Sequence, residues 1–262
     1  MLNYEIYDNQ KENWVVFLHG IGGSTLTWKK QIEAFSEKYN LLLLDLQGHG
    51  KSKSDAAVTV KSVNDSIKEV LDYTGIKKAD FVGLSMGTLV AAQFAIKYPT
   101  YVNSLILGVA VIQVDGIYKL AMKGAGLIKH VLPTRMLYKI FAGIIIPARW
   151  HKKSRDIFLR ESKNMKRKNF LSWMEYISIS TNPKKILDKL KALGIKILFV
   201  SGDHDVCFVK SVKKMAAYID NAKLNIINAC GHVCTIEKYK KFNSLALSYL
   251  KSIHMPKIAL NG

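Results

Sequence analysis

The sequence has few of the features that would export the protein or cross-link it. Only three of its 262 residues are cysteines. Cys207, Cys230 and Cys234 form no CxxC pair and no even-numbered framework, so we expect buried thiols in a reducing compartment. Residues Met1–Asp8 lack the basic start and the apolar core of a signal peptide. These absences favour a cytoplasmic protein.

Long apolar runs and acidic residues are also scarce. The longest candidate membrane segment, Ile140–Ala148, is about half as long as the roughly 20 residues that a spanning helix requires. The chain has 20 Asp and Glu against 39 Lys and Arg, a formal net charge of +19. Such an excess of positive charge is typical of proteins that bind nucleic acid or an anionic membrane surface, but it can also serve solubility alone. No recognised nucleic-acid motif accompanies the charge, so we expect no nucleic-acid partner.

Continuous apolar runs recur along the chain and predict strands of a parallel sheet that is buried on both faces. The predicted strands cover residues 14–18, 41–45, 79–84, 104–110, 195–201 and 223–228, and a short edge strand is expected over residues 2–7. Segments with helical spacing lie between most of these runs. Strands that alternate with helices predict an α/β protein with helices on both faces of the sheet. With 49% hydrophobic residues, the chain can form the core of one large domain.

The alternation of strands and helices stops after residue 112. Helix-like stretches follow, interrupted by Pro133, Pro147 and Pro183, and no convincing strand is visible among them. We therefore predict a helical cap, or lid, over residues 113–187. The core domain would consist of residues 1–112 and 188–262.

The sequence Gly-Leu-Ser-Met-Gly at residues Gly83–Gly87 lies between a predicted strand and a predicted helix. A serine at such a sharp turn has a strained backbone. Glycine two residues away on each side removes the clash that a Cβ would cause. The turn would hold the Ser85 hydroxyl clear of the backbone, at the positive end of the helix. The motif is short, so its meaning depends on the rest of the chain.

A serine hydroxyl needs a base and an orienting acid before it can act as a nucleophile. Both candidates follow later predicted strands, in the sequences Gly202–Asp205 and Gly231-His232. The chain order is therefore Ser, then Asp, then His, which is the order in α/β-hydrolases.

Five separate motifs, in the right order on matching strand ends, resemble those of the α/β-hydrolase superfamily. They are His19-Gly20, Asp45–Ser52, Gly83–Gly87, Gly202–Asp205 and Gly231-His232. The resemblance covers nearly all of residues 14–254. It implies a mostly parallel sheet of about eight strands, with a helical cap inserted after the sixth. Gln47 and Thr88 depart from the usual pattern, where many relatives have Arg and Gly, and neither position carries a catalytic role.

The resemblance implies a role for each member of a catalytic triad. Ser85 would be the nucleophile, His232 the general base and later the acid, and Asp205 the orienting carboxylate. Asp205 is preferred to Asp203 because the family places its acid three residues after the glycine, although both could reach the same turn.

The resemblance also implies an oxyanion hole, formed by the backbone N–H groups of Ile21 and Met86. We expect Trp28 to line the substrate pocket beside Ile21. No metal site is expected, because His204 has no further ligands at suitable spacing, and no cofactor is implied. His19 and His49 are interpreted as structural. The histidines interpreted as surface residues are His130, His151 and His254.

Most of the positive charge falls in the predicted cap. Residues 113–190 contain 17 Lys and Arg and five Asp and Glu, interleaved with large apolar side chains. Three interpretations compete. The first is a solvated basic face over ordinary packing. The second is a cap that rests on an anionic membrane while an acyl chain enters the site. The third is recognition of an anionic substrate, such as a carboxylate or a CoA thioester.

The sequence therefore predicts a serine hydrolase that cleaves a carboxylic ester or thioester, a carboxylesterase, lipase-type enzyme or thioesterase, through an acyl-enzyme. An apolar acyl group would bind under the basic cap. One alternative is a C–C-bond hydrolase or lyase on the same scaffold, including the menaquinone-pathway synthase. Leu89 counts against that synthase, whose relatives usually have Arg there. A haloalkane dehalogenase would need Asp in place of Ser85. The remaining alternative is a ligand-binding homologue without catalysis.

Overall fold

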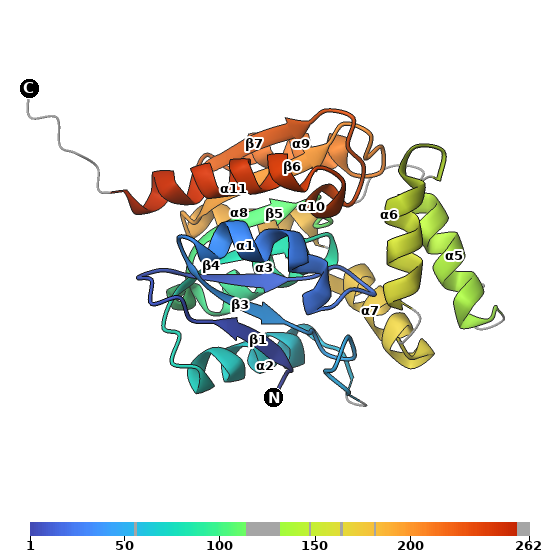
Figure 1. Cartoon of the computed structure of the whole chain (residues 1–262), viewed down its shortest axis with the longest axis horizontal. Helices are drawn as coiled ribbons and strands as arrows, with labels where there is room; N and C mark the ends of the chain where they lie inside the picture. The colour runs from blue at the N-terminus through green and yellow to red at the C-terminus, as the bar shows by residue number, and fades with distance from the viewer. Residues whose placement is uncertain (55–56, 114–131, 147, 163–164, 181, 256–262) are drawn as a thin grey trace, which may run out of the picture.

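A single mixed sheet organises the chain. The structure is a computed structural model that describes residues 1–54, 57–113, 132–146, 148–162, 165–180 and 182–255. Within these ranges seven strands pair in the order β1-β3-β2-β4-β5-β6-β7 (Figure 1). Their bounds are Tyr4–Tyr7 (β1), Trp14–Leu18 (β2), Asn40–Leu44 (β3), Ala79–Leu84 (β4), Val102–Gly108 (β5), Lys196–Gly202 (β6) and Ala222–Ile227 (β7).

The pairing confirms the predicted fold class. The edge strand β1 runs antiparallel to β3, and all other neighbours are parallel. The described residues form seven strands instead of about eight. The predicted cap follows β5, the fifth of these described strands in chain order.

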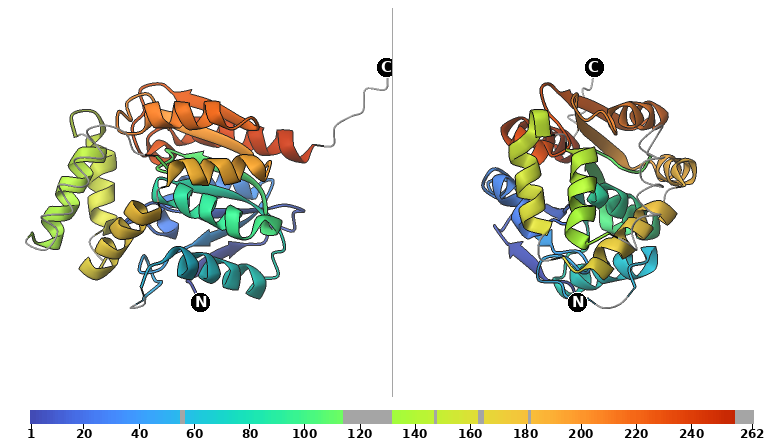
Figure 2. Two further views of the ribbon diagram at one scale, coloured as in Figure 1. Left: turned by 180° about the vertical axis from the view of Figure 1, so that it is seen from behind. Right: turned by 90° about the vertical axis from the view of Figure 1, so that its right-hand side faces the viewer.

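Helices cover both faces of the sheet, which explains why the strands are continuous apolar runs. The helices α1 (Lys29–Ser36) and α11 (Tyr239–His254) lie together on one face. On the other face lie α2 (Val60–Tyr73), α3 (Met86–Lys97) and α8 (Pro183–Ala192) (Figure 2). The remaining core elements are η1 (Thr25–Trp28), η2 (Pro99–Tyr101), α9 (Val209–Tyr218) and α10 (Cys234–Glu237).

The sequence of α2 shows how a surface helix is specified. Thr59 and Ser62 form a capping box, in which each side chain accepts a hydrogen bond from the other residue's backbone N–H at 3.0 Å. The predicted apolar stripe, including Val63 and Ile67, is buried. Gly75 follows the helix with φ +73°, a conformation that suits glycine after a helix end.

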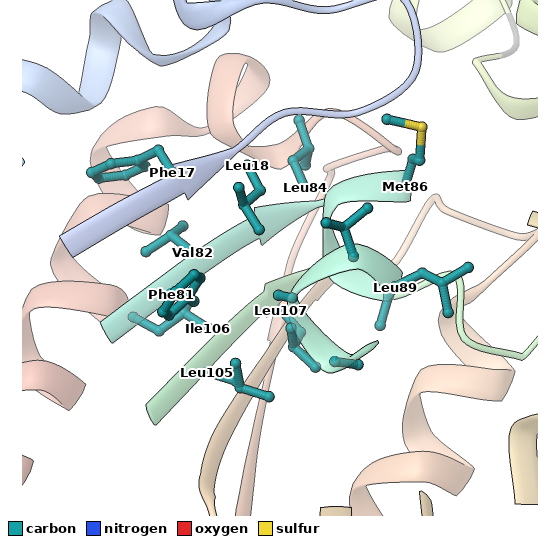
Figure 3. Packing of buried hydrophobic residues seen from close by; sticks show 14 of the residues in the cluster. Phe17, Leu18, Phe81, Val82, Leu84, Met86, Leu89, Leu105, Ile106 and Leu107 are labelled. Atoms are coloured by element: carbon teal, nitrogen blue, oxygen red, sulfur yellow. The ribbon is translucent and has the colours of Figure 1, made fainter. Parts of the chain in front are cut away.

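The helix α3 is different because it is buried on nearly all sides. It packs against β4 and β5 below and against α2 and α8 beside it. Figure 3 shows its first residues, including Met86 and Leu89, beyond the ends of β4 and β5, next to buried side chains of these strands such as Val82 and Leu107. These residues have no exposed surface. The helix that follows Ser85 is therefore fixed by the core.

Three further helices lie beyond the carboxyl ends of the parallel strands (Figure 1). They are α5 (Thr134–Ile145), α6 (Ala148–Glu161) and α7 (Arg167–Ser180). Residues 114–131 of the predicted cap, with His130, lie outside the described residues. The helix α8 crosses the predicted boundary at residues 187 and 188, and it packs against α3.

Two hydrogen bonds attach α7 to the loop that follows β3. The Trp173 indole N–H donates to the carbonyl of Gln47 at 2.8 Å, and the Asn169 amide donates to the carbonyl of Gly48 at 3.2 Å. Trp173 is completely buried by this contact. None of the helices in the described ranges is long and apolar enough to span a membrane. The three cysteines are buried, and no disulfide joins them.

His254 was predicted to be a surface residue, and the structure places it at the surface but only partly exposed. Its Nε2 lies 2.6 Å from Oδ2 of Asp80, which is completely buried in β4 and also accepts a hydrogen bond from the Ser104 hydroxyl. A buried carboxylate requires such partners. The hydrogen bond to Asp80 raises the pKa of His254 above its ordinary value of 6.5, although partial burial opposes the shift.

We expect the His254–Asp80 pair to make the free energy of unfolding depend on pH. Because the folded pKa of His254 is raised, the pair stabilises fully below the unfolded value of 6.5. This contribution is lost as the pH rises through the folded pKa. His254→Gln should therefore cost more stability at about pH 5.5 than at about pH 9, measured by urea unfolding. An equal cost at both pH values, or the same pH dependence in an Asp80→Asn background, would contradict this role.

Candidate active site

Ser85 occupies a strained turn between β4 and α3. Its backbone has φ 51° and ψ −118°, while β4 ends at Leu84 and α3 begins at Met86. For a residue with a Cβ, such a conformation costs on the order of 1–3 kcal/mol. The Ser85 N–H donates to the carbonyl of Gly108 at 2.9 Å, which ties the turn to the end of β5.

The two glycines of the motif are required by close approach of backbones. A Cβ on Gly87 would lie 2.0 Å from the carbonyl oxygen of Leu18, in the neighbouring strand β2. A Cβ on Gly83 would lie 2.5 Å from the carbonyl oxygen of Gly87. Real Cβ atoms do not approach backbone so closely, so both positions need glycine. This is the clash that the sequence pattern predicted.

His232 and Asp205 lie in a chain of hydrogen bonds with Ser85. The Nε2 atom of His232 is 2.9 Å from the Ser85 Oγ, and its Nδ1 atom is 3.2 Å from Oδ2 of Asp205. All three side chains are buried. With Nδ1 as the donor to Asp205, Nε2 is left to accept the Ser85 proton. The arrangement can therefore activate the serine hydroxyl for attack on an electrophilic carbon.

Asp203, the other candidate acid, is placed differently. Its side chain is more than one third exposed, and its Oδ1 accepts a hydrogen bond from the Cys230 N–H at 3.2 Å. Burial raises the pKa of Asp203, but the backbone N–H groups of Cys230 and Ala229 outweigh it and lower that pKa overall. The carboxylate that reaches His232 is that of Asp205.

His19 supports the loop that passes over Ser85. Its Nδ1 contacts the carbonyl of Gly20 at 2.7 Å, and its Nε2 accepts from the N–H of Leu46 at 3.0 Å. These two bonds require the neutral ring with its proton on Nδ1, and burial lowers the pKa of His19. The loop comes close to the serine: a Cβ on Gly20 would lie 3.3 Å from the Ser85 Cβ. His49 packs against His19.

The two expected oxyanion donors are backbone N–H groups on either side of Ser85. Met86 is the first residue of α3, so its N–H has no partner within the helix. Ile21 follows the His19-Gly20 pair and lines the cavity beside Ser85. Among the described residues, neither N–H has a hydrogen-bond acceptor. Both are therefore available to an oxygen atom of a bound molecule.

A cavity of about 60 Å³ opens beside the Ser85 hydroxyl and His232. Its walls are mostly apolar and come from the core and from the cap helices. The apolar lining residues are Ile21, Leu84, Ile145, Ile146, Ile157, Phe158, Val233 and Ile236. Its single charged residue among the described positions is Glu161, and no described Lys or Arg lines it. Glu161 forms an ion pair with the exposed Arg160 at 3.3 Å, and such surface pairs contribute little.

Trp28 does not line this cavity, contrary to the sequence prediction. It is completely buried, and its ring packs against Phe17 with ring centroids 5.0 Å apart. The neighbouring residue Thr27 lines the cavity instead. Trp28 thus belongs to the core beneath α1 and cannot touch a molecule bound beside Ser85.

A buried pair that the sequence did not indicate joins the cap to the loop of His232. Oε2 of Glu237 accepts a hydrogen bond from the Gly231 N–H at 2.6 Å and contacts Nδ1 of His151 at 3.0 Å. Less than a tenth of either side chain is exposed. His151 lies in α6 at a break in the helix, with φ −133° and ψ 36°. The prediction that His151 is a surface residue is wrong.

Within the described ranges, no group of three or more His, Cys, Asp or Glu side chains is arranged to hold a metal ion. The candidate site brings together Ser85, His232, Asp205, the two backbone N–H groups and the apolar cavity.

The fold and this arrangement define a class of protein, and comparisons with known proteins agree with it. A family model described as alpha/beta hydrolase fold matches residues 13–126. The crystal structure of the enol-lactonase from Burkholderia xenovorans LB400 superposes with a TM-score of 0.84 at 18% identity, covering 95% of this chain and 96% of that one. The chain therefore has the α/β-hydrolase fold.

Two curated relatives match over nearly the whole chain. The 2-hydroxy-6-oxononadienedioate/2-hydroxy-6-oxononatrienedioate hydrolase of Paraburkholderia phymatum is 26% identical, and the match covers 90% of this chain and 86% of the relative. The 3-oxoadipate enol-lactonase 1 of Acinetobacter baylyi is 24% identical, with 96% and 94% covered. This chain is similar to both.

We predict that Glu237→Ala destabilises the protein and lowers its hydrolytic activity. The substitution leaves the Gly231 N–H and the His151 ring without their partner in a buried place. Each such loss costs about 1–3 kcal/mol. It also frees the loop that carries His232. Urea unfolding and turnover of a p-nitrophenyl ester measure the two effects.

Glu175→Ala provides the matched control, because Glu175 is an exposed acid in α7. It should change the free energy of unfolding by less than about 0.5 kcal/mol. If Glu237→Ala matched this control in both measurements, the pair of Glu237 and His151 would not be needed to position the loop that carries His232.

Proposed function

We propose that the chain is a serine hydrolase that cleaves a carboxylic ester or thioester with a short, uncharged, apolar acyl group. The observation that carries the proposal is the hydrogen-bonded chain from Ser85 through His232 to Asp205, placed beside an apolar cavity. Ser85 would be the nucleophile, His232 the general base and acid, and Asp205 the group that orients the imidazole.

The reaction would proceed in two halves. As the Ser85 Oγ attacks the carbonyl carbon, His232 Nε2 takes the hydroxyl proton, and Asp205 stabilises the imidazolium. The carbonyl oxygen becomes an oxyanion that accepts hydrogen bonds from the N–H groups of Ile21 and Met86, each worth about 2.7–4 kcal/mol in the transition state. Collapse of this intermediate breaks the ester bond, and His232 gives its proton to the leaving alcohol or thiol.

Water then completes the reaction. His232 accepts a proton from a water molecule as its oxygen attacks the acyl carbon on Ser85. A second oxyanion forms in the same place and collapses, the bond to Ser85 Oγ breaks, and His232 returns the proton to that oxygen. The products are a carboxylic acid and the free enzyme.

The cavity indicates which acyl groups fit. Ile145, Ile157 and Phe158 give it an apolar wall, and its small volume suits a short chain. The carboxylate of Glu161 lines the same cavity. No described Lys or Arg lines it to neutralise the charge of a negatively charged substrate. Like charges in a partly buried site repel, so the cavity favours an uncharged acyl group.

The comparisons support an ester as the bond that is cleaved, and they also support a second candidate reaction. A lactone is an internal ester, and the Acinetobacter baylyi relative is an enol-lactonase. The Paraburkholderia phymatum relative is named for a dioate substrate, which supports the alternative of C–C-bond cleavage on this scaffold. A dioate carries two carboxylates, however, and the charge of the Ser85 cavity opposes them. For the menaquinone-pathway synthase, the fully buried Leu89 at the expected arginine position counts against the assignment.

We expect a fluorophosphonate probe to label the protein once, at Ser85. Ser85→Ala should lose the label and lower the turnover of p-nitrophenyl acetate by a factor on the order of 10⁴–10⁶. Ser154→Ala should still be labelled, because Ser154 lines the same cavity but has no base beside it. Mass spectrometry of the labelled peptide locates the probe. Absence of labelling in the folded protein would favour a ligand-binding role without catalysis.

We further expect discrimination against a negatively charged acyl group. The kcat/KM value for a p-nitrophenyl butyrate should exceed that for the corresponding hemisuccinate. Glu161→Gln should raise the value for the hemisuccinate by about threefold to tenfold and leave that for butyrate nearly unchanged, since only the anion meets the charge. Glu175→Gln, which removes an exposed acid elsewhere in the cap, is the control. Faster turnover of the hemisuccinate by the unmodified protein would refute the assigned acyl class.

A further inference from the structure

One side of the cap helix α6 lies along the Ser85 cavity. Four residues of this helix line the cavity, and they share one side of the helix because they are spaced three and four apart. They are Ser154, Ile157, Phe158 and Glu161. The far end of α6 packs on the loop of the expected oxyanion donors, where a Cβ on Gly22 would lie 3.6 Å from the ring of Phe158. A molecule that fills the cavity would therefore touch α6.

His151 lies near the start of α6, at the break in that helix, and its ring packs on the loop that carries His232. A Cβ on Gly231 would lie 2.7 Å from the Cδ2 atom of His151. The Glu237 carboxylate holds the same two residues, since it accepts from the Gly231 N–H at 2.6 Å and contacts His151 Nδ1 at 3.0 Å. An ionised carboxylate only accepts hydrogen bonds, so Nδ1 is the donor. A group from the cap thus acts one residue away from His232.

The loop that carries Asp205 meets His151 as well. The rings of His151 and His204 have centroids 5.7 Å apart. Two hydrogen bonds tie this loop to the loop that follows β7. The His204 N–H donates to the Cys230 carbonyl at 2.9 Å, and the Cys230 N–H donates to Oδ1 of Asp203 at 3.2 Å. His151 therefore lies where the loops of two triad residues are joined.

Packing alone does not explain a histidine at this position. The Nε2 atom of His151 and the Oε1 atom of Glu237 are buried, and neither has a hydrogen-bond partner among the described residues. Buried polar atoms without partners cost stability. An apolar ring of similar size would fill the same space without that cost. What the histidine adds is its directional contact with Glu237 and, through Glu237, with Gly231.

We propose that His151 is a positioning residue, which couples the filling of the Ser85 cavity to the alignment of His232 and Asp205. This inference rests on the reaction proposed for Ser85. An acyl group in the cavity would contact the middle of α6, and the start of the same helix would hold both loops in their reactive positions. Such alignment matters because a displacement of about 1 Å can lower a rate about a hundredfold.

His151→Phe tests the contact with Glu237, because it keeps a ring on Gly231 and removes the donor. It should lower kcat for p-nitrophenyl butyrate by about tenfold or more and change KM by less than about threefold, since alignment is lost while the cavity is kept. His151→Gln, whose amide can donate to Glu237, should recover part of the loss.

Asn169→Ala is the matched control for these variants. It removes a hydrogen bond from another cap helix to the core, at the carbonyl of Gly48, and its kcat should stay within about twofold of the original value. Equal losses of kcat in His151→Phe and Asn169→Ala, or an unchanged kcat in His151→Phe, would overturn the proposal.

A double-mutant cycle tests the coupling along α6. Phe158 is seven residues from His151, about 10 Å along a helix, and substitutions so far apart usually act independently. Phe158→Ala removes the ring that an acyl group would contact. If the two positions are coupled, the double variant with His151→Phe should keep at least about threefold more kcat than the product of the two separate losses allows. Independent losses would overturn the proposal.

A third measurement requires no turnover. The proton on Nδ1 of His232, which lies toward Asp205, is followed as a downfield NMR signal and identified by its loss in His232→Gln. His151→Phe should shift or broaden this signal, and Asn169→Ala should leave it in place. An unchanged signal in His151→Phe would overturn the proposal. A changed signal in a protein that no fluorophosphonate labels would support the positioning role and refute only the reaction proposed for Ser85.

Discussion

The close approach of α3 to the carboxyl end of β2 is the constraint on which the site depends. Gly87 brings the helix backbone against the carbonyl of Leu18, at a distance that admits no Cβ. The chain must then pass from β4 into α3 within one residue. This residue is Ser85, and the sharp turn forces it to a positive φ. The strain is held by the nearly complete burial of α3 in the core. Packing of the core around α3 therefore sets the position of the serine hydroxyl.

Among the described residues, several polar contacts attach the cap to this core. On one side Trp173 and Asn169 donate to the carbonyls of Gln47 and Gly48. On the other side His151 meets Glu237, which also holds the Gly231 N–H. Between the two attachments the cap covers the Ser85 cavity with apolar side chains. Directional contacts fix how the cap is oriented, while the apolar contacts shape what can bind beneath it.

Sequence patterns predicted the elements of the core well, because a strand buried on both faces must be a continuous apolar run. The strand over residues 14–18 and the helix that begins at residue 209 have the predicted starts. The histidines were harder. His151 and His254 pair with Glu237 and Asp80, residues that are distant in sequence, and no local pattern reveals such partners. Trp28 was misplaced because a residue beside the oxyanion loop can face the cavity or the core, and its spacing alone does not decide which.

The charge of the Ser85 cavity also bears on how a product would leave. Hydrolysis of an uncharged ester creates a carboxylic acid, which ionises at neutral pH. The new anion would stand beside Glu161, in a cavity that no described Lys or Arg lines. Repulsion between the two carboxylates would drive the acid out and keep it from rebinding. The same side chain that we propose selects against charged substrates would thus limit inhibition by the product and favour rapid turnover.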